Sequence, residues 1–171
     1  MTGRIRPAGS KRAVASGLVI LQLALLAALV IEPYGGWWPR NTVIWVATGI
    51  VVVGGLAIAV WGVVGLGSAL TASPIPKERA PLVTHGIYGL VRNPIYTGLI
   101  FIGAGLALFG ASWWHLVTWI ALLVLLTVKT FWEEHLLYET HPEFGEYAVR
   151  VGRFFPGLGT WPTTSIPWAK K

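Results

Sequence analysis

Long apolar runs are the feature that most constrains the fold of this chain. The run from Thr42 to Leu66 contains no charged side chain, and the run from Ala13 to Ile31 is interrupted only by small or uncharged polar residues. A helix needs about 20 apolar residues to cross the hydrocarbon core of a bilayer. Both runs therefore predict membrane-spanning helices. A basic pair at 11–12 also fits a secretory signal, but the run behind it is longer than a signal core, so we interpret it as a span.

A third apolar run, from Ile95 to Val128, is too long for one crossing at about 1.5 Å per residue. Gly110-Ala111-Ser112 near its middle predicts a tight hairpin of two short or tilted spans. Charged residues make up 12% of the chain, against about 25% in a typical soluble domain. The sequence thus predicts an all-α, polytopic membrane protein with about four transmembrane helices, followed by a cytoplasmic C-terminal helix and tail.

The distribution of basic residues predicts the orientation in the membrane. Cytoplasmic loops carry an excess of Lys and Arg, and here, of 13 such residues, only Arg40 falls outside the N-terminus, the middle loop and the C-terminal part of the chain. Trp37-Trp38 and Trp113-Trp114 fall in the opposite connections, where indoles anchor at the headgroup level. Integral membrane localisation with both termini in the cytoplasm is therefore expected.

Three parts follow from this layout. Residues 1–12 form a basic cytoplasmic N-terminus, residues 13–66 two N-terminal spans, and residues 67–171 a core made of the cytoplasmic loop, the hairpin and the C-terminal segment. The Gly, Pro and Trp residues around Pro156-Gly157 and Trp161-Pro162 predict a tail lying on the membrane surface.

Charge and residue usage exclude several classes of function. The net charge of +6 comes from residues that flank apolar runs, which indicates contact with anionic membrane lipids rather than nucleic acid. The absence of cysteine excludes disulfides and a cysteine nucleophile. The four histidines show no metal-ligand spacing, so no metal site is expected. No feature of the sequence indicates an oligomeric state.

The first candidate site surrounds the start of the third apolar run. Asn is favoured as an N-cap and Pro at the first helical position, so Asn93-Pro94 predicts a helix start, with Arg92 as a topological anchor. Tyr88 and Tyr96 flank this start, and a helix N-terminus facing water offers free N–H groups to a ligand carboxylate. The residues alone leave a plain helix start and a ligand site equally open.

The second candidate site is Glu133-Glu134, in a short stretch that holds most of the seven acidic residues of the chain. These glutamates could belong to a solvated helix end, with Lys129 and Glu133 as an ordinary i, i+4 pair. However, carboxylates at the C-terminal end of a helix oppose its dipole. Either the helix continues, or the glutamates face a cation such as an ammonium or sulfonium group.

At these two segments the chain resembles the isoprenylcysteine carboxyl methyltransferase and phospholipid methyltransferase family of integral membrane methyltransferases. The matching residues run in order through the second half of the chain: Leu82, Val83, Gly86, Tyr88, Arg92, Pro94, Tyr96, Gly98, Glu133, Glu134, Leu137, Tyr147, Val151, Arg153, Phe154 and Pro156. Asn93 departs from the pattern, since the family usually has His there. Phe144 stands where the first of two paired tyrosines is expected.

The resemblance implies S-adenosylmethionine as the methyl donor and a lipophilic or lipid-modified acceptor. The donor site it implies comprises Leu82, Val83, Tyr88, Arg92, Asn93, Pro94, Ile95, Tyr96, Glu133 and Glu134, and Lys129 takes the place of a family arginine on the acceptor side. We expect the Asn93 cap to hold the methionyl carboxylate and the two glutamates its amino group. The acceptor is expected to enter between the third and fourth spans. This hypothesis requires Tyr96 and Glu133 to reach one ligand.

Two other functions stay open at this point. Membrane sterol reductases resemble this family in the same C-terminal region but use NADPH, so nicotinamide binding would indicate a reductase. A non-enzymatic assembly or transport subunit would bind no cofactor. Transporters are also expected to carry ionisable groups at mid-bilayer, and the interiors of these predicted spans contain none.

Overall fold

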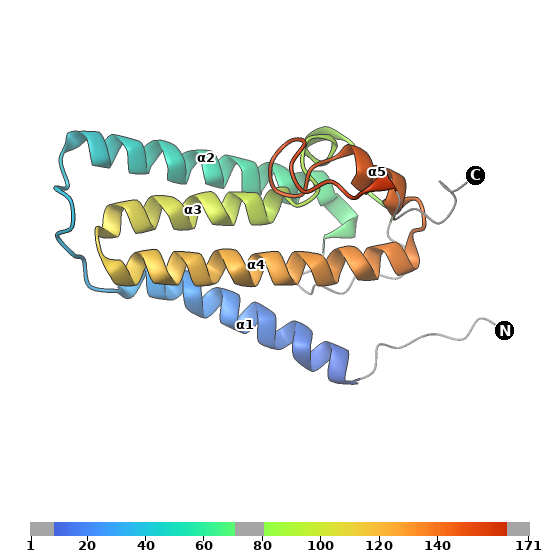
Figure 1. Ribbon diagram of the computed structural model, residues 1–171, viewed down its shortest axis with the longest axis horizontal. Helices are drawn as coiled ribbons and strands as arrows, with labels where there is room; N and C mark the ends of the chain where they lie inside the picture. Colours follow the sequence, from blue (N-terminus) through green and yellow to red (C-terminus); the bar gives the residue numbers. More distant parts are fainter. Residues whose placement is uncertain (1–8, 71–80, 164–171) are drawn as a thin grey trace.

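A computed structural model describes residues 9–70 and 81–163 of the chain (Figure 1). Its helices are α1 (Gly9–Ile31), α2 (Thr42–Leu66), α3 (Pro94–Gly110), α4 (Trp113–Thr140) and α5 (Phe144–Arg150), with short 3-10 turns η1 (Gly67–Ala69) and η2 (Gly86–Gly89). No β-strand occurs among the described residues, so the predicted all-α class is confirmed. The predictions for residues 1–8, for the loop charges Lys77 and Arg79, and for the last eight residues lie outside the described part of the chain.

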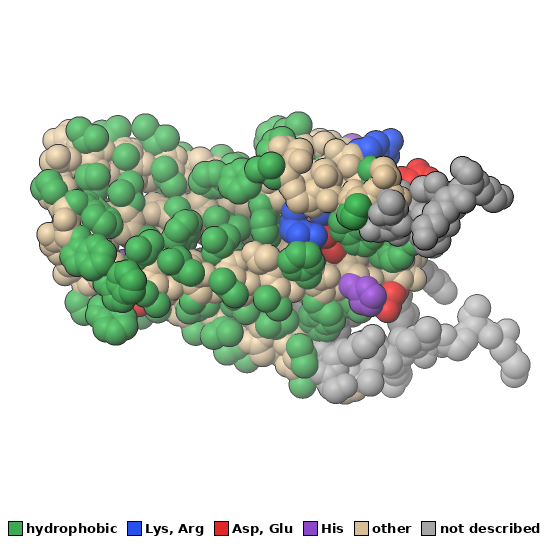
Figure 2. Space-filling model, viewed as in Figure 1, with side chains coloured by type: hydrophobic (Ala, Val, Ile, Leu, Met, Phe, Trp, Pro, Cys, Tyr) green, Lys and Arg blue, Asp and Glu red, His purple; other side chains and the backbone are tan. Residues whose placement is uncertain are grey.

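Within the described part of the chain, three helices are long and apolar enough to cross a membrane. They are Ala13–Ile31 within α1, Thr42–Leu66, and Trp113–Thr140. A further apolar helix, α3, is shorter than these three. It has 17 residues, which gives a length of about 26 Å. Apolar side chains cover most of the visible surface along the helices, and most visible charged side chains gather at the end that holds α5 (Figure 2). The chain is therefore an all-α membrane protein with three long candidate spans and a shorter apolar helix.

The predicted hairpin break at 110–112 is confirmed. Ala111 has a left-handed backbone conformation (φ 47°), and Ser112 caps α4 by accepting a hydrogen bond from the Trp114 amide. The connection between α1 and α2 lies against this turn, because the Gly35 amide donates to the Gly110 carbonyl at 2.8 Å. The Trp37 and Trp113 rings lie 5.7 Å apart, so both predicted aromatic connections share one end of the molecule.

Close contact between α2 and α3 positions the start of α3. A Cβ added to Gly55 would lie 2.7 Å from the Gly98 carbonyl oxygen, and one added to Gly98 would lie 2.7 Å from the Ala59 Cβ. Small residues of this kind let membrane helices approach closely. A Cβ on Gly62 would lie 2.9 Å from Ile95. The last turns of α2 therefore lie directly against the first turn of α3, where the first candidate site was predicted.

The first helix is packed at one end and diverges at the other. Leu29 of α1 packs with Leu122 and Leu126 of α4 near the Trp-rich end. Towards the opposite end, α1 slants away from the other helices (Figure 1). Most of its apolar side chains, such as Ile20 and Leu23, are consequently exposed to the surroundings. The divergence leaves room for a cavity at the end where α5 lies.

The C-terminal segment folds back onto the helices. Trp161 packs edge-to-face on Tyr138 and Phe144, with ring centroids 5.4 and 5.6 Å apart, and its amide donates to the Ala148 carbonyl. The prediction that the segment around Trp161 lies on the membrane surface stays a prediction, while Trp161 itself packs against side chains of the protein. Its indole has polar and aromatic partners inside the protein, which a single sequence does not indicate.

Candidate functional site

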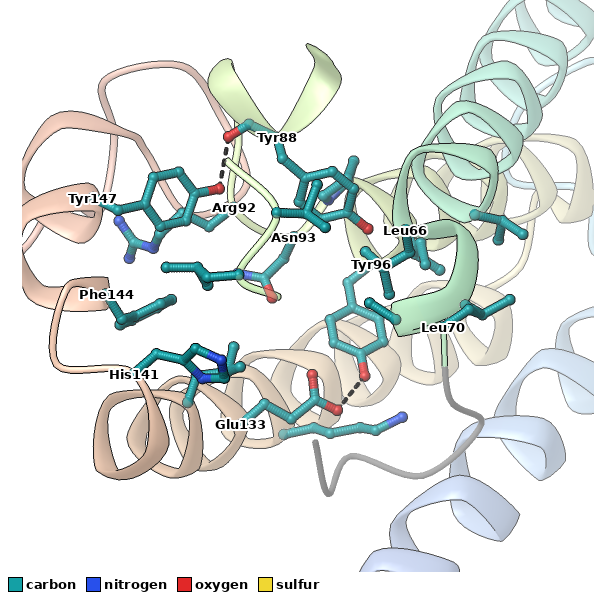
Figure 3. Close-up of a pocket in the computed structure, with 18 of the residues that line it drawn as sticks. Leu66, Leu70, Tyr88, Arg92, Asn93, Tyr96, Glu133, His141, Phe144 and Tyr147 are labelled. Atoms are coloured by element: carbon teal, nitrogen blue, oxygen red, sulfur yellow. Dashed lines mark hydrogen bonds between the residues drawn. The ribbon is translucent and has the colours of Figure 1, made fainter. Parts of the chain in front are cut away.

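A cavity of about 490 Å³ lies at the end of the molecule that holds α5. This volume falls within the range of about 300–1,000 Å³ that is usual for small-molecule sites. All five helices contribute to the lining, together with the segment that precedes α3. The polar or aromatic lining residues are Gln22, Tyr88, Arg92, Asn93, Tyr96, Lys129, Glu133, His141, Phe144 and Tyr147. Figure 3 shows several of these side chains, among them Tyr96, Glu133 and His141, converging from the start of α3, from the end of α4 and from the turn that follows it.

Tyr96 and Glu133 meet inside this cavity. The Tyr96 hydroxyl donates to Glu133 Oε1 at 2.5 Å, which joins the first turn of α3 to the C-terminal part of α4 (Figure 3). Among the described residues, Glu133 has no ion pair and no second hydrogen-bond donor. One carboxylate oxygen is therefore available to a cationic ligand. The structure brings together the two residues that the hypothesis required to share one ligand.

Lys129 has a different partner from the one expected. Its Nζ donates to Gln22 Oε1 of α1 at 2.8 Å and lies 4.8 Å from the centroid of the Tyr96 ring. Lys129 and Glu133 form no direct ion pair, although the two charges are close enough to interact. Lys129 points across the cavity towards α1, and its side chain is buried, with 3% exposed.

Two tyrosines form a neutral, hydrogen-bonded wall. The Tyr88 hydroxyl donates to the Gly62 carbonyl at 3.2 Å, and the Tyr147 hydroxyl donates to the Tyr88 carbonyl at 2.6 Å. Burial raises the pKa of Tyr88, and the nearby Glu133 charge raises it further. Burial likewise raises the pKa of Tyr147. Both hydroxyls therefore remain protonated donors at physiological pH and fix the segment before α3 against α2 and α5.

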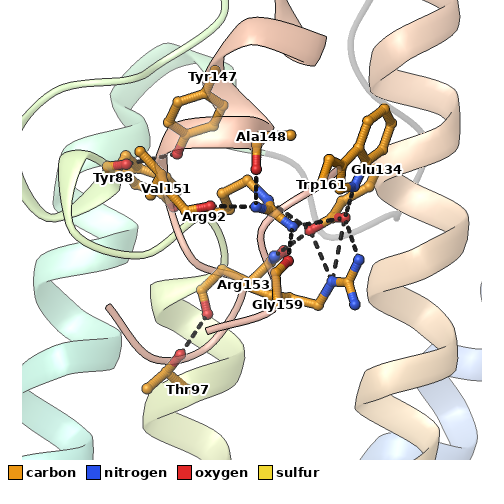
Figure 4. A network of polar contacts seen from close by, with 11 residues as sticks. Tyr88, Arg92, Thr97, Glu134, Tyr147, Ala148, Val151, Arg153, Gly159 and Trp161 are labelled. Atoms are coloured by element: carbon orange, nitrogen blue, oxygen red, sulfur yellow. Dashed lines mark hydrogen bonds and ion pairs between the residues drawn. The ribbon is translucent and has the colours of Figure 1, made fainter. Parts of the chain in front are cut away.

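Glu134 lies in a separate polar cluster beside the cavity. Its carboxylate accepts hydrogen bonds from Arg92 Nε at 3.0 Å, Arg153 Nη2 at 2.9 Å, Asn93 Nδ2 at 3.1 Å and the Trp161 indole at 3.2 Å (Figure 4). The residue is 2% exposed and does not line the cavity. A carboxylate with this many donors has no capacity left for a ligand.

Arg92 holds the C-terminal segment through this same cluster. Besides pairing with Glu134, its guanidinium donates to the carbonyls of Ala148, Val151 and Gly159 (Figure 4). The Arg92 amide also donates to the Gly152 carbonyl at 2.8 Å. The predicted role of Arg92 as a topological anchor does not describe these contacts, because the side chain is buried and ties three parts of the chain together.

Most of the residues predicted for the site line the cavity. They are Leu82, Val83, Tyr88, Arg92, Asn93, Pro94, Ile95, Tyr96, Lys129 and Glu133. Glu134 is the exception. Asn93 and Pro94 occupy the predicted N-cap and first helical positions, but the Asn93 side chain makes no capping bond. The side-chain amide of Asn93 donates to Glu134 instead. The backbone carbonyl of Asn93 accepts from the amide and the hydroxyl of Thr97.

Sequence reasoning missed the contributions of α1 and α5. Gln22 stands out in the sequence only as a polar residue inside an apolar run, and its contact with Lys129 depends on helix packing. His141, Phe144 and Tyr147 line the cavity from the turn after α4 and from α5. The contacts of Arg92 with Glu134 and with the Ala148 carbonyl hold α5 beside the segment that precedes α3, and no local pattern reveals them.

The apolar side of the cavity does not lie where it was predicted. Val19 and Leu23 of α1 and Val63 and Leu66 of α2 form this side. Helices α3 and α4 pack against one another instead, with the Trp119 indole donating to the Ile100 carbonyl at 3.0 Å. The route by which an acceptor enters stays a prediction, and the apolar lining from α1 and α2 offers a second route beside the predicted one between the third and fourth spans.

The described residues contain no group of three or more His, Cys, Asp or Glu side chains placed to hold a metal ion.

Residues 43–143 match the model of a family described as phospholipid methyltransferase. This match covers more than half of the chain, including α2, α3, α4 and most of the residues that line the cavity.

Two relatives are similar over most of the chain. The nickel-cobalt-cadmium resistance protein NccN of Alcaligenes xylosoxydans xylosoxydans is 32% identical over 127 residues, which cover 71% of this chain and 56% of the relative. The cobalt-zinc-cadmium resistance protein CzcN of Cupriavidus metallidurans is 32% identical over 124 residues, 68% of this chain and 54% of the relative. The chain thus spans about half the length of these curated relatives.

Proposed function

The chain belongs to the phospholipid methyltransferase family, and from this premise we propose that it transfers a methyl group from S-adenosylmethionine to a lipophilic acceptor. The observation that carries the proposal is the Tyr96–Glu133 hydrogen bond of 2.5 Å inside a cavity lined by all five helices. It supports a single ligand site shared by the start of α3 and the end of α4.

The charges and free donors of the cavity suit this methyl donor. Its ammonium and sulfonium groups are cations, and Glu133 offers a carboxylate oxygen that no described residue occupies. Its carboxylate needs N–H donors. Pro94 has no N–H, and the Thr97 amide is paired with Asn93, so the Ile95 and Tyr96 amides are the donors at the start of α3 that have no backbone partner among the described residues. We assign the methionyl carboxylate to these amides rather than to the Asn93 side chain.

The remaining walls would position the rest of the donor and the acceptor. Tyr88 and Tyr147, held by their hydrogen bonds, and Phe144 offer flat surfaces for an adenosine group. The apolar side formed by α1 and α2 suits an acyl or prenyl chain reaching the cavity from the bilayer. The donor supplies a methyl group on a sulfonium, and methyl transfer is an in-line displacement in which alignment provides much of the rate enhancement.

The distribution of Lys and Arg supports a cytoplasmic location for the cavity. Arg92, Arg150 and Arg153 belong to the cavity end of the molecule, whereas Arg40 precedes α2 at the opposite, Trp-rich end. Positive residues favour the cytoplasmic side. We therefore propose that α1 begins, and the C-terminal segment folds, on the cytoplasmic face, where S-adenosylmethionine is available.

The proposal is tested by incubating the purified protein with S-[methyl-³H]adenosylmethionine and a membrane lipid extract. The expected result is label in an extractable product, whose mass increases by one methylene relative to its precursor. Binding of S-adenosylhomocysteine and of NADPH is measured in parallel by calorimetry. Binding of NADPH without S-adenosylhomocysteine would replace the methyltransferase proposal by the reductase alternative, and binding of neither would favour a non-enzymatic protein.

A further inference from the structure

The turn that follows α4 carries an imidazole on the wall of the cavity. His141 lines the cavity beside Phe144, and it is not among the residues that the resemblance to the family implies for the donor site. Figure 3 shows the His141 ring between Phe144 and Glu133, away from Leu66 and Leu70. The position of His141 therefore associates it with the aromatic wall at α5 rather than with the apolar side formed by α1 and α2.

Hydrogen bonds hold His141 in place. Its backbone amide donates to the Leu137 carbonyl at 2.7 Å, and its carbonyl accepts from the Phe144 amide at 2.9 Å. In the side chain, Nδ1 lies 2.9 Å from the hydroxyl oxygen of Thr140. The backbone and the ring are thus both fixed by neighbouring groups, as recognition of a ligand requires.

These contacts also assign the proton of the neutral imidazole. The Thr140 hydroxyl has one proton, and it is directed at the carbonyls of Leu136 and Leu137, at 3.1 and 3.2 Å. The hydroxyl oxygen therefore accepts the hydrogen bond from His141, so that Nδ1 carries the proton and Nε2 is an acceptor. In its neutral form His141 thus supplies a hydrogen-bond acceptor to this wall of the cavity.

His141 lies about two helical turns beyond Glu133 along α4. Glu133, Leu137 and His141 are four residues apart, so they follow one side of the helix, and all three line the cavity. The rise of the helix separates the first from the last by about 12 Å. The proposed donor carries its ammonium group and its adenine at opposite ends. A donor whose ammonium group pairs with Glu133 can therefore extend along this side of α4 and bring its adenine towards His141.

The edge and the faces of adenine match this wall. The exocyclic amine of adenine is a hydrogen-bond donor, which an imidazole acceptor complements, and proteins that read a single base combine such edge contacts with aromatic stacking. Phe144 lines the cavity next to His141 and is 1% exposed. Its ring packs edge-to-face with those of Tyr147 and Trp161, with centroids 5.8 and 5.6 Å away. A well-packed aromatic ring therefore accompanies the acceptor.

We propose that Nε2 of His141 accepts a hydrogen bond from the exocyclic amine of the donor's adenine, so that His141 selects adenosyl over other nucleosidyl ligands. This inference rests on the proposed methyltransferase function and names the residue that recognises the base of its donor. It predicts discrimination against a ligand in which a carbonyl oxygen replaces the amine, because two acceptors would then face each other. Sites that hydrogen-bond an N–H group of a ligand reject analogues that lack it.

The test measures the binding of two ligands that differ at this position of the base. S-adenosylhomocysteine has the exocyclic amine, and S-inosylhomocysteine has an oxygen in its place. Calorimetric titration of the detergent-solubilised wild-type protein at about pH 8 should give a Kd at least roughly tenfold higher for the inosyl compound. Equal affinities would overturn the inference. Binding of neither compound would instead refute the proposed function itself.

Two variants assign the preference to His141. His141→Leu should raise the Kd of S-adenosylhomocysteine about tenfold and leave that of the inosyl compound within about threefold, so that the preference disappears. The amide introduced by His141→Gln can accept from the amine or donate to the carbonyl oxygen, so this variant should bind the two ligands within about threefold of each other. A wild-type preference in His141→Leu, or an equal loss of affinity for both ligands, would show that His141 does not contact the base.

His135→Leu is the matched control. His135 also belongs to α4, but its side chain is exposed, pairs with Glu139 and does not line the cavity. This variant should keep the wild-type Kd for both ligands within about threefold. The same loss of preference in His135→Leu as in His141→Leu would attribute the effect to a general disturbance of α4 and would contradict the assignment to His141.

Discussion

Glu133 and Glu134 are adjacent in the sequence but belong to two different regions of the molecule. Successive residues of a helix point about 100° apart, so Glu133 faces the cavity and Glu134 faces the C-terminal segment. Glu133 has one hydrogen-bond donor, Tyr96, whereas Glu134 has donors from Arg92, Arg153, Asn93 and Trp161. The difference indicates that Glu134 stabilises the fold and that Glu133 retains capacity for a ligand.

The largest expected effect is the loss of stability in Glu134→Gln. The substitution keeps the shape of the side chain but leaves Arg92 and Arg153 without their carboxylate in a buried place. Breaking a buried ion pair in this way costs about 3–5 kcal/mol. Thermal unfolding of the detergent-solubilised protein, followed by Trp fluorescence, measures the change.

Glu139→Gln is the matched control for this variant. Glu139 lies on the same helix and pairs with His135, but both side chains are at least half exposed. Its replacement should change stability by less than about 0.5 kcal/mol. Equal unfolding midpoints for Glu134→Gln and Glu139→Gln would show that the cluster around Glu134 does not hold the fold.

Glu133→Gln is expected to have the opposite profile. A hydrogen bond to a charged group contributes about 1.5–3 kcal/mol, so the affinity for S-adenosylhomocysteine should fall by roughly tenfold to a hundredfold. The unfolding midpoint should change far less than in Glu134→Gln, because Glu133 has a single described partner. Calorimetric titration with S-adenosylhomocysteine measures the affinity. An unchanged Kd would remove Glu133 from the donor site.

The sequence predicted the elements of the fold well because their causes are local. Uninterrupted apolar runs gave α1 and α2, and Gly110-Ala111-Ser112 marked the hairpin turn. Pro94 marked the first residue of α3. These features depend on hydropathy and on backbone preferences of a few neighbouring residues, which are present in any single sequence.

The contacts between distant segments could not be predicted in the same way. The different contacts of the two glutamates depend on which side of α4 faces the C-terminal segment. The hydrogen bond from the Trp161 indole to Glu134 likewise joins residues that are 27 positions apart. The partner of Lys129 was expected on its own helix and proved to be Gln22, 107 residues away. Each of these outcomes follows from tertiary packing, for which a local pattern carries no signal.

Tyr96→Phe sharpens the comparison on the cavity side. It removes the hydroxyl that donates to Glu133 but keeps the ring that lies 4.8 Å from Lys129 Nζ. The hydroxyl orients the carboxylate but leaves its charge in place, so its loss should weaken donor binding by about 0.5–1.5 kcal/mol, less than removal of the charge itself. The Kd of S-adenosylhomocysteine should therefore rise by about twofold to tenfold, less than in Glu133→Gln. A larger loss than in Glu133→Gln would mean that the hydroxyl itself, rather than the carboxylate it orients, contacts the donor.

Asn93→Ala tests the boundary between the two regions and should have the smallest effect. Asn93 lines the cavity, yet its side-chain amide donates to Glu134 and makes no capping bond with α3. Because the backbone carbonyl of Asn93, which the substitution keeps, accepts from Thr97, the helix start should persist. Glu134 would lose one of its four donor residues, which predicts a stability loss of about 1 kcal/mol.

The affinity for S-adenosylhomocysteine should change by less than about threefold in Asn93→Ala. A tenfold or greater loss of affinity would assign the Asn93 side chain to the donor site, as the resemblance to the family implied. Asn93 would then belong with Glu133 in the cavity rather than with the cluster around Glu134.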